Sequence, residues 1–311
     1  MSEKNILVIK HGSLGDWIQA TGAFKLIRKH HPDSNIIMLT QSQYLPLANK
    51  CGWFNEVWED NRLPLHKLNP NLQIIKKLRS KRYEHVYDLQ CSSRTSMYFY
   101  FFQDKVQNWY GRTRGCSHYV PFDPELHAVE LSYAILNASG ITKTSPPDVS
   151  WLKENNFVLK IKSFSPFVLF IPGASAKHPA KRWDAKSYAI TIDSLAYRRI
   201  KSVLIGTEID RDIIEEIMAS CEYLPINLIN KAHFAEIAEL SRAALGVVGG
   251  DTGPLHLAAA TNATIVAMFS KFSDPNKTRP WGPKVTIVEE EDLSFLEPNR
   301  VISEILDTTV F

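Results

Sequence analysis

The 311-residue chain is poor in cysteine and has no long apolar run. Its four cysteines are scattered, with no C-x-x-C pair, which argues against a disulfide scaffold and a zinc ribbon. No apolar run approaches the roughly 20 residues that a membrane-spanning helix needs. The N-terminal residues lead into a short strand rather than into the apolar core of a signal peptide. We therefore expect a cytoplasmic protein with reduced thiols, and peripheral contact with a membrane stays open.

A large excess of one charge is also missing. The chain has 36 Lys and Arg residues against 33 Asp and Glu residues, a net charge of +3. This balance does not favour nucleic acid as a partner. The basic residues nevertheless cluster over residues 76–82 and again over residues 177–182. A solvated helix face explains the first cluster, and an anionic acceptor or membrane surface is the alternative.

Nucleotide-binding motifs of fixed spacing are absent too. The loop after the apolar run 6–9 reads Gly12-Ser13-Leu14-Gly15-Asp16 and does not fit G-x-G-x-x-G, which leaves a dehydrogenase as a distant alternative. The loop over residues 172–183 has small residues and lysines but lacks the G-K-[ST] ending of a P-loop. Any nucleotide site in this chain therefore has to be built differently.

What the chain does have is a regular alternation of apolar runs of strand length with helical patterns, which predicts parallel sheets. The Pro-rich segment 145–166 is typical of a connection between domains. We predict an α/β protein with two Rossmann-like domains over residues 1–160 and 161–311, with the C-terminal helix free to pack back on the first domain. Strands are expected at 6–9, 36–39, 85–89, 167–171, 202–205, 226–229, 245–248 and 264–269, and helices at 17–31, 128–138, 184–198, 210–219, 234–243 and after 252.

The most informative segment is Gly249-Gly250-Asp251-Thr252-Gly253-Pro254-Leu255-His256, between a predicted strand and a predicted helix. A Gly-rich turn at a helix N-terminus gathers backbone N–H groups into an anion site, for which a diphosphate is the natural occupant. Asp251 and His256 flank the turn and can hydrogen-bond a sugar or a leaving group. The alternative is an ordinary turn in which Asp251 caps the helix.

Three further loops follow predicted strands, where ligands of parallel sheets bind. Asp16 lies at the start of the first helix and is either its cap or a general base. Ser175 and Lys181 belong to a loop of phosphate-facing composition, for which a basic surface loop packed over Trp183 is the alternative. Asp210 can accept a hydrogen bond from a ribose hydroxyl or cap the next helix.

Taken together, these loops resemble glycosyltransferase family 9, the ADP-heptose:lipopolysaccharide heptosyltransferases. The matching segments occur in the family's order and cover nearly the whole chain. They are residues 6–16 (ILVIKHGSLGD), 23–28 (AFKLIR) with 32–33 (PD), 87–90 (YDLQ) with 93–96 (SRTS), 172–174 (PGA) with 181–183 (KRW), and 251–258 (DTGPLHLA).

The resemblance implies a GT-B-type fold, in which two Rossmann-like domains face a central cleft, the first holding the acceptor and the second the nucleotide sugar. It makes Asp16 the catalytic base and Lys181 a contact of the diphosphate. The implied site residues are, for catalysis, Asp16 and Lys181; for the donor, Ser175, Lys181, Asp210, Asp251, Thr252, Gly253 and His256; and for the acceptor, Ser13, Gln90 and Arg94.

Two departures from the family pattern stand out: Cys91-Ser92 follows Gln90 where Gly is common, and Ser175 is single where some members carry two hydroxyl residues. The implied function is an inverting transfer of heptose from ADP-heptose to a lipopolysaccharide core or lipid A acceptor. Neither a cofactor nor a metal is expected, and the anionic glycolipid acceptor implies peripheral attachment to the inner face of the inner membrane. A GT-B enzyme with another nucleotide sugar and a non-catalytic nucleotide-sugar or glycan-binding protein are the alternatives.

Overall fold

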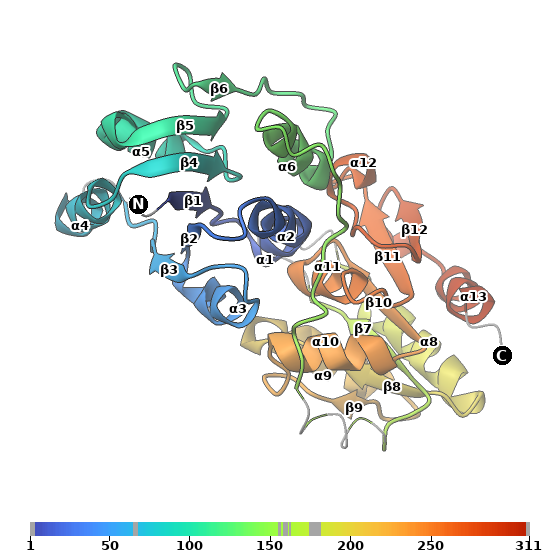
Figure 1. Cartoon of the computed structure of the whole chain (residues 1–311). Coiled ribbons are helices and arrows are strands. Elements are labelled where there is room, and N and C mark those ends of the chain that lie inside the picture. The colour runs from blue at the N-terminus through green and yellow to red at the C-terminus, as the bar shows by residue number, and fades with distance from the viewer. Residues whose placement is uncertain are drawn as a thin grey trace. The chain divides into compact units, whose positions relative to one another are not determined.

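The computed structural model describes residues 4–64, 68–154, 157, 161, 163–173 and 182–308 (Figure 1). The chain divides into two compact units, Met1–Trp151 and Leu152–Phe311. Each unit holds a six-stranded parallel sheet with helices on both faces. The predicted fold class, α/β with two Rossmann-like domains, is therefore confirmed.

The two sheets have the same topology although the sequence shows no repeat. Their strand orders are β3-β2-β1-β4-β5-β6 and β12-β11-β10-β7-β8-β9. Counted from the first strand of each unit, both orders are 3-2-1-4-5-6, that of the doubly wound Rossmann fold. The strands of the first unit are β1 Asn5–Ile9, β2 Asn35–Thr40, β3 Glu56–Glu59, β4 Tyr83–Asp88, β5 Val106–Gly111 and β6 His118–Tyr119. Those of the second are β7 Phe167–Ile171, β8 Lys201–Leu204, β9 Ile226–Asn227, β10 Gly246–Gly250, β11 Ile265–Ser270 and β12 Val285–Glu290.

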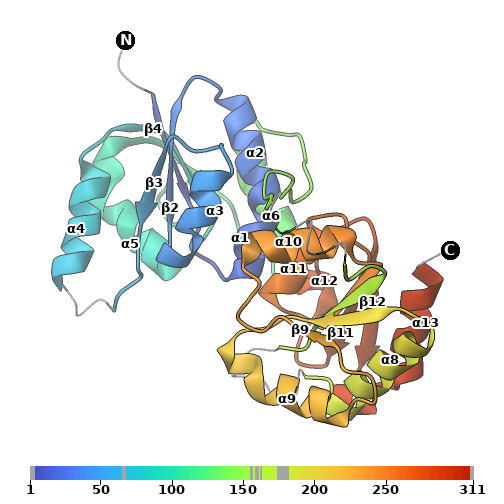
Figure 2. The same ribbon diagram turned by 90° about the horizontal axis from the view of Figure 1, so that it is seen from below.

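Helices cover both faces of the first sheet, as Figure 2 shows. The core between the sheet, α4 and α5 contains Trp109 and Phe102, and the other face packs against α1, α2 and α6. The predicted helix over 17–31 is instead two helices that meet at Ala20, where the Thr21 hydroxyl donates to the Ile18 carbonyl at 2.6 Å. The helices are α1 Leu14–Gln19, α2 Thr21–His30, α3 Leu45–Lys50, α4 Leu68–Arg79, α5 Ser93–Phe102 and α6 Ala128–Asn137, with 3₁₀ turns at Ser42–Tyr44 and Gln103–Lys105.

The second sheet is covered in the same way. Its core faces α8, α9 and α13, and α10 packs beside α11. The predicted cap of α8 is confirmed, because Asp184 accepts a hydrogen bond from the Ser187 N–H at 3.0 Å. The side chain of Trp183, the residue before this cap, is buried, and its indole N–H donates to the Leu296 carbonyl at 2.8 Å. The helices are α8 Ala185–Tyr197, α9 Arg211–Ser220, α10 Phe234–Ala243, α11 Gly253–Ala259, α12 Pro275–Thr278 and α13 Pro298–Thr308, with 3₁₀ turns at Glu208–Asp210 and Leu293–Phe295.

The glycines of the segment 249–256 are not part of a turn, which corrects the sequence-based expectation. Gly249 and Gly250 are the last residues of β10, and Gly249 pairs with Ile171 of β7. A Cβ on Gly249 would lie 3.0 Å from both the Cβ and the carbonyl oxygen of Ile171. Glycine therefore permits close contact between β10 and β7, and only Asp251 and Thr252 link the strand to α11.

Candidate functional site

In the first unit, the loop after β1 carries Asp16 in a capping box with Ser13. Asp16 Oδ2 accepts hydrogen bonds from the Ser13 N–H and hydroxyl, both at 3.1 Å. In return, the Ser13 hydroxyl accepts from the Asp16 N–H at 3.3 Å. Within the described ranges, Asp16 Oδ1 has no hydrogen-bond partner. Ser13, not Asp16, is the N-cap residue of α1. One carboxylate oxygen of Asp16 thus stabilises the loop, and the other stays available to a ligand.

Gln90 holds this loop in place from the neighbouring strand. It follows β4, which pairs with β1 so that Asp88 lies beside Ile9. Its Oε1 accepts hydrogen bonds from the His11 N–H at 2.9 Å and the Gly12 N–H at 2.8 Å. The side-chain oxygen of this predicted acceptor residue is therefore used internally, which leaves its amide nitrogen for a ligand.

Asp60, directly after β3, belongs to the same sheet edge and was not predicted. Its Oδ2 lies 2.9 Å from Nε2 of His11 and accepts from the Tyr98 hydroxyl at 2.6 Å. Burial raises the pKa of Asp60, but the contacts with His11 and Tyr98 and a bond from the Arg62 N–H outweigh it and lower the pKa to about 2. The sequence analysis predicted no strand over residues 56–59, so it did not single out Asp60, the acidic residue directly after that strand.

Arg94, the third predicted acceptor residue, is engaged within the first unit. Its guanidinium donates to Asn71 Oδ1 at 3.1 Å, to the Tyr98 hydroxyl at 3.0 Å and to the Leu63 carbonyl. It also lies 4.0 Å from Asp60 Oδ1, and 12% of its side chain is exposed. Arg94 thus joins α5 to α4 and to the segment after β3. Direct contact between Arg94 and an acceptor stays a prediction.

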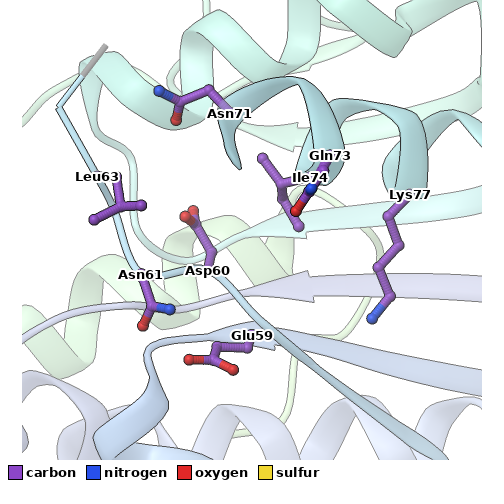
Figure 3. Close-up of a pocket in the computed structure, with 8 residues that line it drawn as sticks. All are labelled: Glu59, Asp60, Asn61, Leu63, Asn71, Gln73, Ile74 and Lys77. Carbon is purple, nitrogen blue, oxygen red and sulfur yellow. The ribbon is translucent and has the colours of Figure 1, made fainter. Parts of the chain in front are cut away.

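Next to these residues lies a cavity of about 320 Å³ (Figure 3). Its lining combines carboxylates, carboxamides and one lysine with two apolar side chains. The lining residues are Glu59, Asp60, Asn61, Leu63, Asn71, Gln73, Ile74 and Lys77. Groups of this kind both accept and donate hydrogen bonds, which suits a ligand rich in hydroxyl groups.

In the second unit, Asp251 is held by side chains of α11, of α12 and of the segment between β11 and α12. Its Oδ2 accepts from the Ser273 hydroxyl at 2.9 Å and the Thr278 hydroxyl at 3.3 Å, and its Oδ1 lies 3.4 Å from Nε2 of His256. Thr252, not Asp251, is the N-cap residue of α11. The alternative interpretation of Asp251 as a helix cap is therefore wrong.

Thr252 brings an unpaired polar atom to the same place. Its Oγ1 is buried and has no hydrogen-bond partner in the part of the chain that the structure describes. A buried hydroxyl without a partner is costly unless a ligand completes it. The Asp251, Thr252 and His256 side chains and the Gly253 backbone thus lie together, as the segment predicted.

Asp210 repeats the arrangement of Asp16. Its Oδ2 accepts from the Thr207 N–H at 2.9 Å and the Thr207 hydroxyl at 3.0 Å. Its other oxygen faces the backbone of Gly173, where a Cβ would lie 2.5 Å from Oδ1. The residue is buried. It stands at the N-cap position of α9, but its side chain makes no capping hydrogen bond to that helix and instead closes the capping box of Thr207. A hydrogen bond to ribose stays a prediction.

Ser175 and Lys181, the two remaining predicted donor residues, lie outside the described residues.

Asp210 and Asp212 have the D-x-D spacing of metal-dependent transferases, but Asp210 is buried against Thr207 while Asp212 is exposed. Among the residues that the structure describes, no three His, Cys, Asp or Glu side chains are placed to hold a metal ion. Equally, no helix in the described part is long and apolar enough to cross a membrane.

The chain as a whole is similar to known proteins. The model of glycosyltransferase family 9 (heptosyltransferase) matches residues 71–301. Lipopolysaccharide heptosyltransferase 3 of Escherichia coli K12 is 25% identical over 287 residues, or 86% of this chain and 82% of that protein. Lipooligosaccharide heptosyltransferase 2 of Haemophilus influenzae is 27% identical over 319 residues, or 91% and 88%.

Among solved structures, E. coli heptosyltransferase WaaC with ADP matches at a TM-score of 0.79 and 17% identity, covering 98% of this chain and 99% of that one. This likeness confirms the GT-B-type fold. The family match spans well over half of the sequence. The chain therefore belongs to glycosyltransferase family 9.

Proposed function

We propose that this glycosyltransferase moves heptose from ADP-heptose to a lipopolysaccharide core or lipid A acceptor with inversion at the anomeric carbon. The family match supports transfer of heptose, and relatives named lipopolysaccharide and lipooligosaccharide heptosyltransferases support the acceptor class. The observation that carries the chemistry is the position of Asp16. It lies at the carboxyl end of β1, with one oxygen fixed by Ser13 and the other without a partner in the described ranges.

In this proposal Asp16 is the general base. A sugar hydroxyl does not ionise near neutral pH, so it needs a proton acceptor as it attacks the anomeric carbon. A positioned carboxylate contributes about 10²–10⁴-fold to such a step. Attack from the side opposite the leaving ADP inverts the anomeric configuration. Ser13 and Gln90 fix the loop that carries the base.

The second unit binds the donor. The unpaired Thr252 hydroxyl and the Gly253 N–H face the diphosphate, and Asp251 with His256 contacts the sugar. Lys181 and Ser175 complete the phosphate contacts, while Asp210 accepts from ribose. A lysine about 4 Å from the leaving diphosphate contributes a Coulomb attraction near 4 kcal/mol at an effective dielectric constant of 20.

The first unit binds the acceptor. The cavity beside Asp60 lies at the same sheet edge as Asp16 and offers hydrogen-bonding groups to the acceptor's sugars. The acceptor is an anionic glycolipid, and the enzyme attaches peripherally to the inner face of the membrane to reach it. The basic residues of the first unit support this, although Lys81 pairs with Glu56 at 2.6 Å and Arg79 pairs with Asp104 at 2.8 Å.

Catalysis in this scheme needs no metal, because Lys181 and backbone N–H groups balance the charge of the departing ADP. We expect turnover to persist in excess EDTA. Loss of turnover that Mg²⁺ or Mn²⁺ restores would contradict the scheme.

A panel of nucleotide sugars tests the donor. Each is offered with a delipidated core oligosaccharide, and both the released nucleotide and the lengthened product are measured. ADP-heptose should give the highest kcat/KM. A higher value with another nucleotide sugar would favour the other GT-B transferase. Binding of a donor with neither product formation nor ADP release would favour a non-catalytic binding protein.

A further inference from the structure

The helices α4 and α5 lie beside each other in the first unit (Figure 1), and both carry exposed side chains that are large and apolar or basic. Leu72 is 50% exposed, Tyr100 57% and Phe101 48%. Lys76 and Arg79 follow Leu72 at four and seven residues, so they line one side of the helix with it. We call Leu72, Lys76, Arg79, Tyr100, Phe101 and Arg114 the α4–α5 surface.

This surface is held together by contacts between its parts. Arg79 donates to the Phe101 carbonyl at 2.5 Å and makes two further bonds to Asp104 at 2.8 Å and 3.0 Å. The Tyr100 hydroxyl donates to the Arg114 carbonyl at 3.1 Å. Arg79 thus ties the end of α4 to the end of α5, and Tyr100 ties α5 to the segment after β5, while both aromatic rings stay exposed to water. Monomeric proteins rarely keep such groups exposed together without a partner.

The charge of this region differs from that of the rest of the chain. Residues 68–115 contain nine Lys and Arg residues and three Asp and Glu residues, a net charge of +6. Because the whole chain carries +3, all other residues together carry −3. In the described part of the chain, the side chains of Lys76 and Arg114 have no acidic partner. Their charges are therefore available to an external anion.

We propose that the α4–α5 surface docks onto an anionic lipid bilayer. Aromatic side chains favour the boundary between lipid headgroups and acyl chains, and Lys and Arg are attracted to anionic headgroups. A second copy of this chain fits the same face poorly, because two such basic surfaces repel each other. The purpose of this docking rests on the proposed lipid-linked acceptor, but binding itself can be measured without catalysis.

The test is flotation of the full chain with vesicles of pure phosphatidylcholine or of phosphatidylcholine with phosphatidylglycerol. We expect binding to the anionic vesicles only, weakening as NaCl rises because salt screens exposed charges. The double variant Tyr100→Ser/Phe101→Ser should lower the partition coefficient by about tenfold or more, since withdrawing large apolar groups from lipid is costly. The charge reversal Lys76→Glu/Arg114→Glu should abolish binding.

Matched controls lie elsewhere on the chain. Phe272→Ser/Phe295→Ser removes aromatic side chains that are 53% and 71% exposed in the second unit. Lys29→Glu/Lys284→Glu makes the same change in net charge at other exposed positions. Both control variants should float like the wild type. Circular dichroism and ADP affinity, which the surface does not touch, show whether each variant is folded.

The proposal is overturned if the wild type does not float with anionic vesicles, or if both α4–α5 variants float as it does. It is also overturned if these variants abolish a dimer in sedimentation while vesicle binding stays unchanged. Transfer to a delipidated acceptor separates this result from the proposed function. The α4–α5 variants should keep the wild-type kcat there, whereas failure of the wild type on every acceptor would count against the proposed function alone.

Discussion

Asp16 and Asp210 show how one local motif can serve two purposes. In both, a hydroxyl residue stands three positions before the aspartate, and one carboxylate oxygen closes a capping box with it. The difference lies in the second oxygen. That of Asp16 has no partner among the described residues, whereas that of Asp210 faces Gly173. The same sequence pattern therefore yields one carboxylate available for chemistry and one packed against backbone.

Replacing Asp16 by asparagine tests its role as a base. We expect Asp16→Asn to lower kcat by about 10²–10⁴-fold, because the amide cannot accept the proton. Donor affinity should stay within a few-fold, since the amide oxygen can still accept from Ser13. Steady-state kinetics and calorimetry measure both, with Asp33→Asn, an exposed aspartate of the same unit, as control. Near-normal turnover in Asp16→Asn would leave Asp16 only its structural role as the partner of the N-cap residue Ser13.

The role of Lys181 in donor binding can be tested by measuring nucleotide affinity, without any transfer reaction. We expect Lys181→Ala to weaken the binding of both ADP and ADP-heptose, because in the proposed function this lysine is a contact of the diphosphate. Titration calorimetry measures the two affinities. Lys186→Ala, an exposed lysine at the start of α8, should bind both ligands normally. If Lys181→Ala also binds them normally, Lys181 is merely a surface charge.

At the scale of the element, glycines set how closely the backbone of the second unit packs. Gly249 lets β10 lie against β7 at Ile171, and Gly173 leaves room for Asp210 directly after β7. Both sites lie at the carboxyl ends of strands, where a ligand of a doubly wound sheet binds. The absence of a side chain therefore shapes the site as much as the polar groups do.

A methyl group at Gly173 should separate packing from chemistry. Its carbon would lie 2.5 Å from Asp210 Oδ1, so Gly173→Ala displaces the carboxylate or the strand end. We expect a loss of about 1–3 kcal/mol in the free energy of unfolding, the usual cost of overpacking, together with weaker donor binding. Urea unfolding and ADP titration measure these changes.

The control is Gly246→Ala in β10, where the nearest atom to the new carbon is 3.9 Å away. Gly246→Ala should lower the free energy of unfolding and the affinity for ADP far less than Gly173→Ala does. Equal behaviour of the two variants would show that Asp210 tolerates displacement and that the close approach carries no function.

For the whole molecule, we expect stability against acid to depend on two histidines of the first unit. Burial, helped by the nearby His85, His30 and basic groups, lowers the pKa of His31 to about 3. Burial also lowers the pKa of His85, although Glu84 acts in the opposite direction. His31 Nε2 lies 2.9 Å from the Tyr87 hydroxyl, and His85 Nδ1 lies 3.2 Å from that of Tyr110. The surroundings of both rings thus disfavour the protonated form.

We expect the free energy of unfolding to fall as the pH drops below about 6.5, because the unfolded chain then binds protons that the folded His31 and His85 exclude. Above pH 6.5 both states hold these rings neutral and the effect vanishes. The low pKa of Asp60, about 2, adds its own loss only below about pH 4. Urea unfolding at pH 7.5 and 5.0 measures the difference.

His31→Gln should shrink that difference between the two pH values. His30→Gln, at the exposed neighbouring position, should shrink it far less, because the charge of His30 is a smaller cause of the low pKa of His31 than burial is. An equal pH dependence in the wild type and His31→Gln would mean that His31 is not excluded from protonation in the folded state.

How far the sequence leads is clearest from single segments. The run 167–171 is β7 at the predicted bounds, and Asp184 caps α8 as predicted, because apolar runs and caps are local signals. The strand over 226–229 is shorter than predicted, and β3 was missed, because Glu56-Val57-Trp58-Glu59 has no apolar run. Because β3 was not predicted, the sequence analysis also failed to identify Asp60 and its contact with His11.

By itself, the sequence determined the two α/β units, the family and the segments that carry the candidate site, since each depends on residues adjacent in the chain. Only the tertiary structure decided which side chains remain available to a ligand. Arg94 is committed to Asn71 and Tyr98, while Thr252 Oγ1 is buried with no described partner. The reason is physical: whether a polar group is satisfied depends on residues that are distant in the chain and meet only when strands pair and helices pack on them.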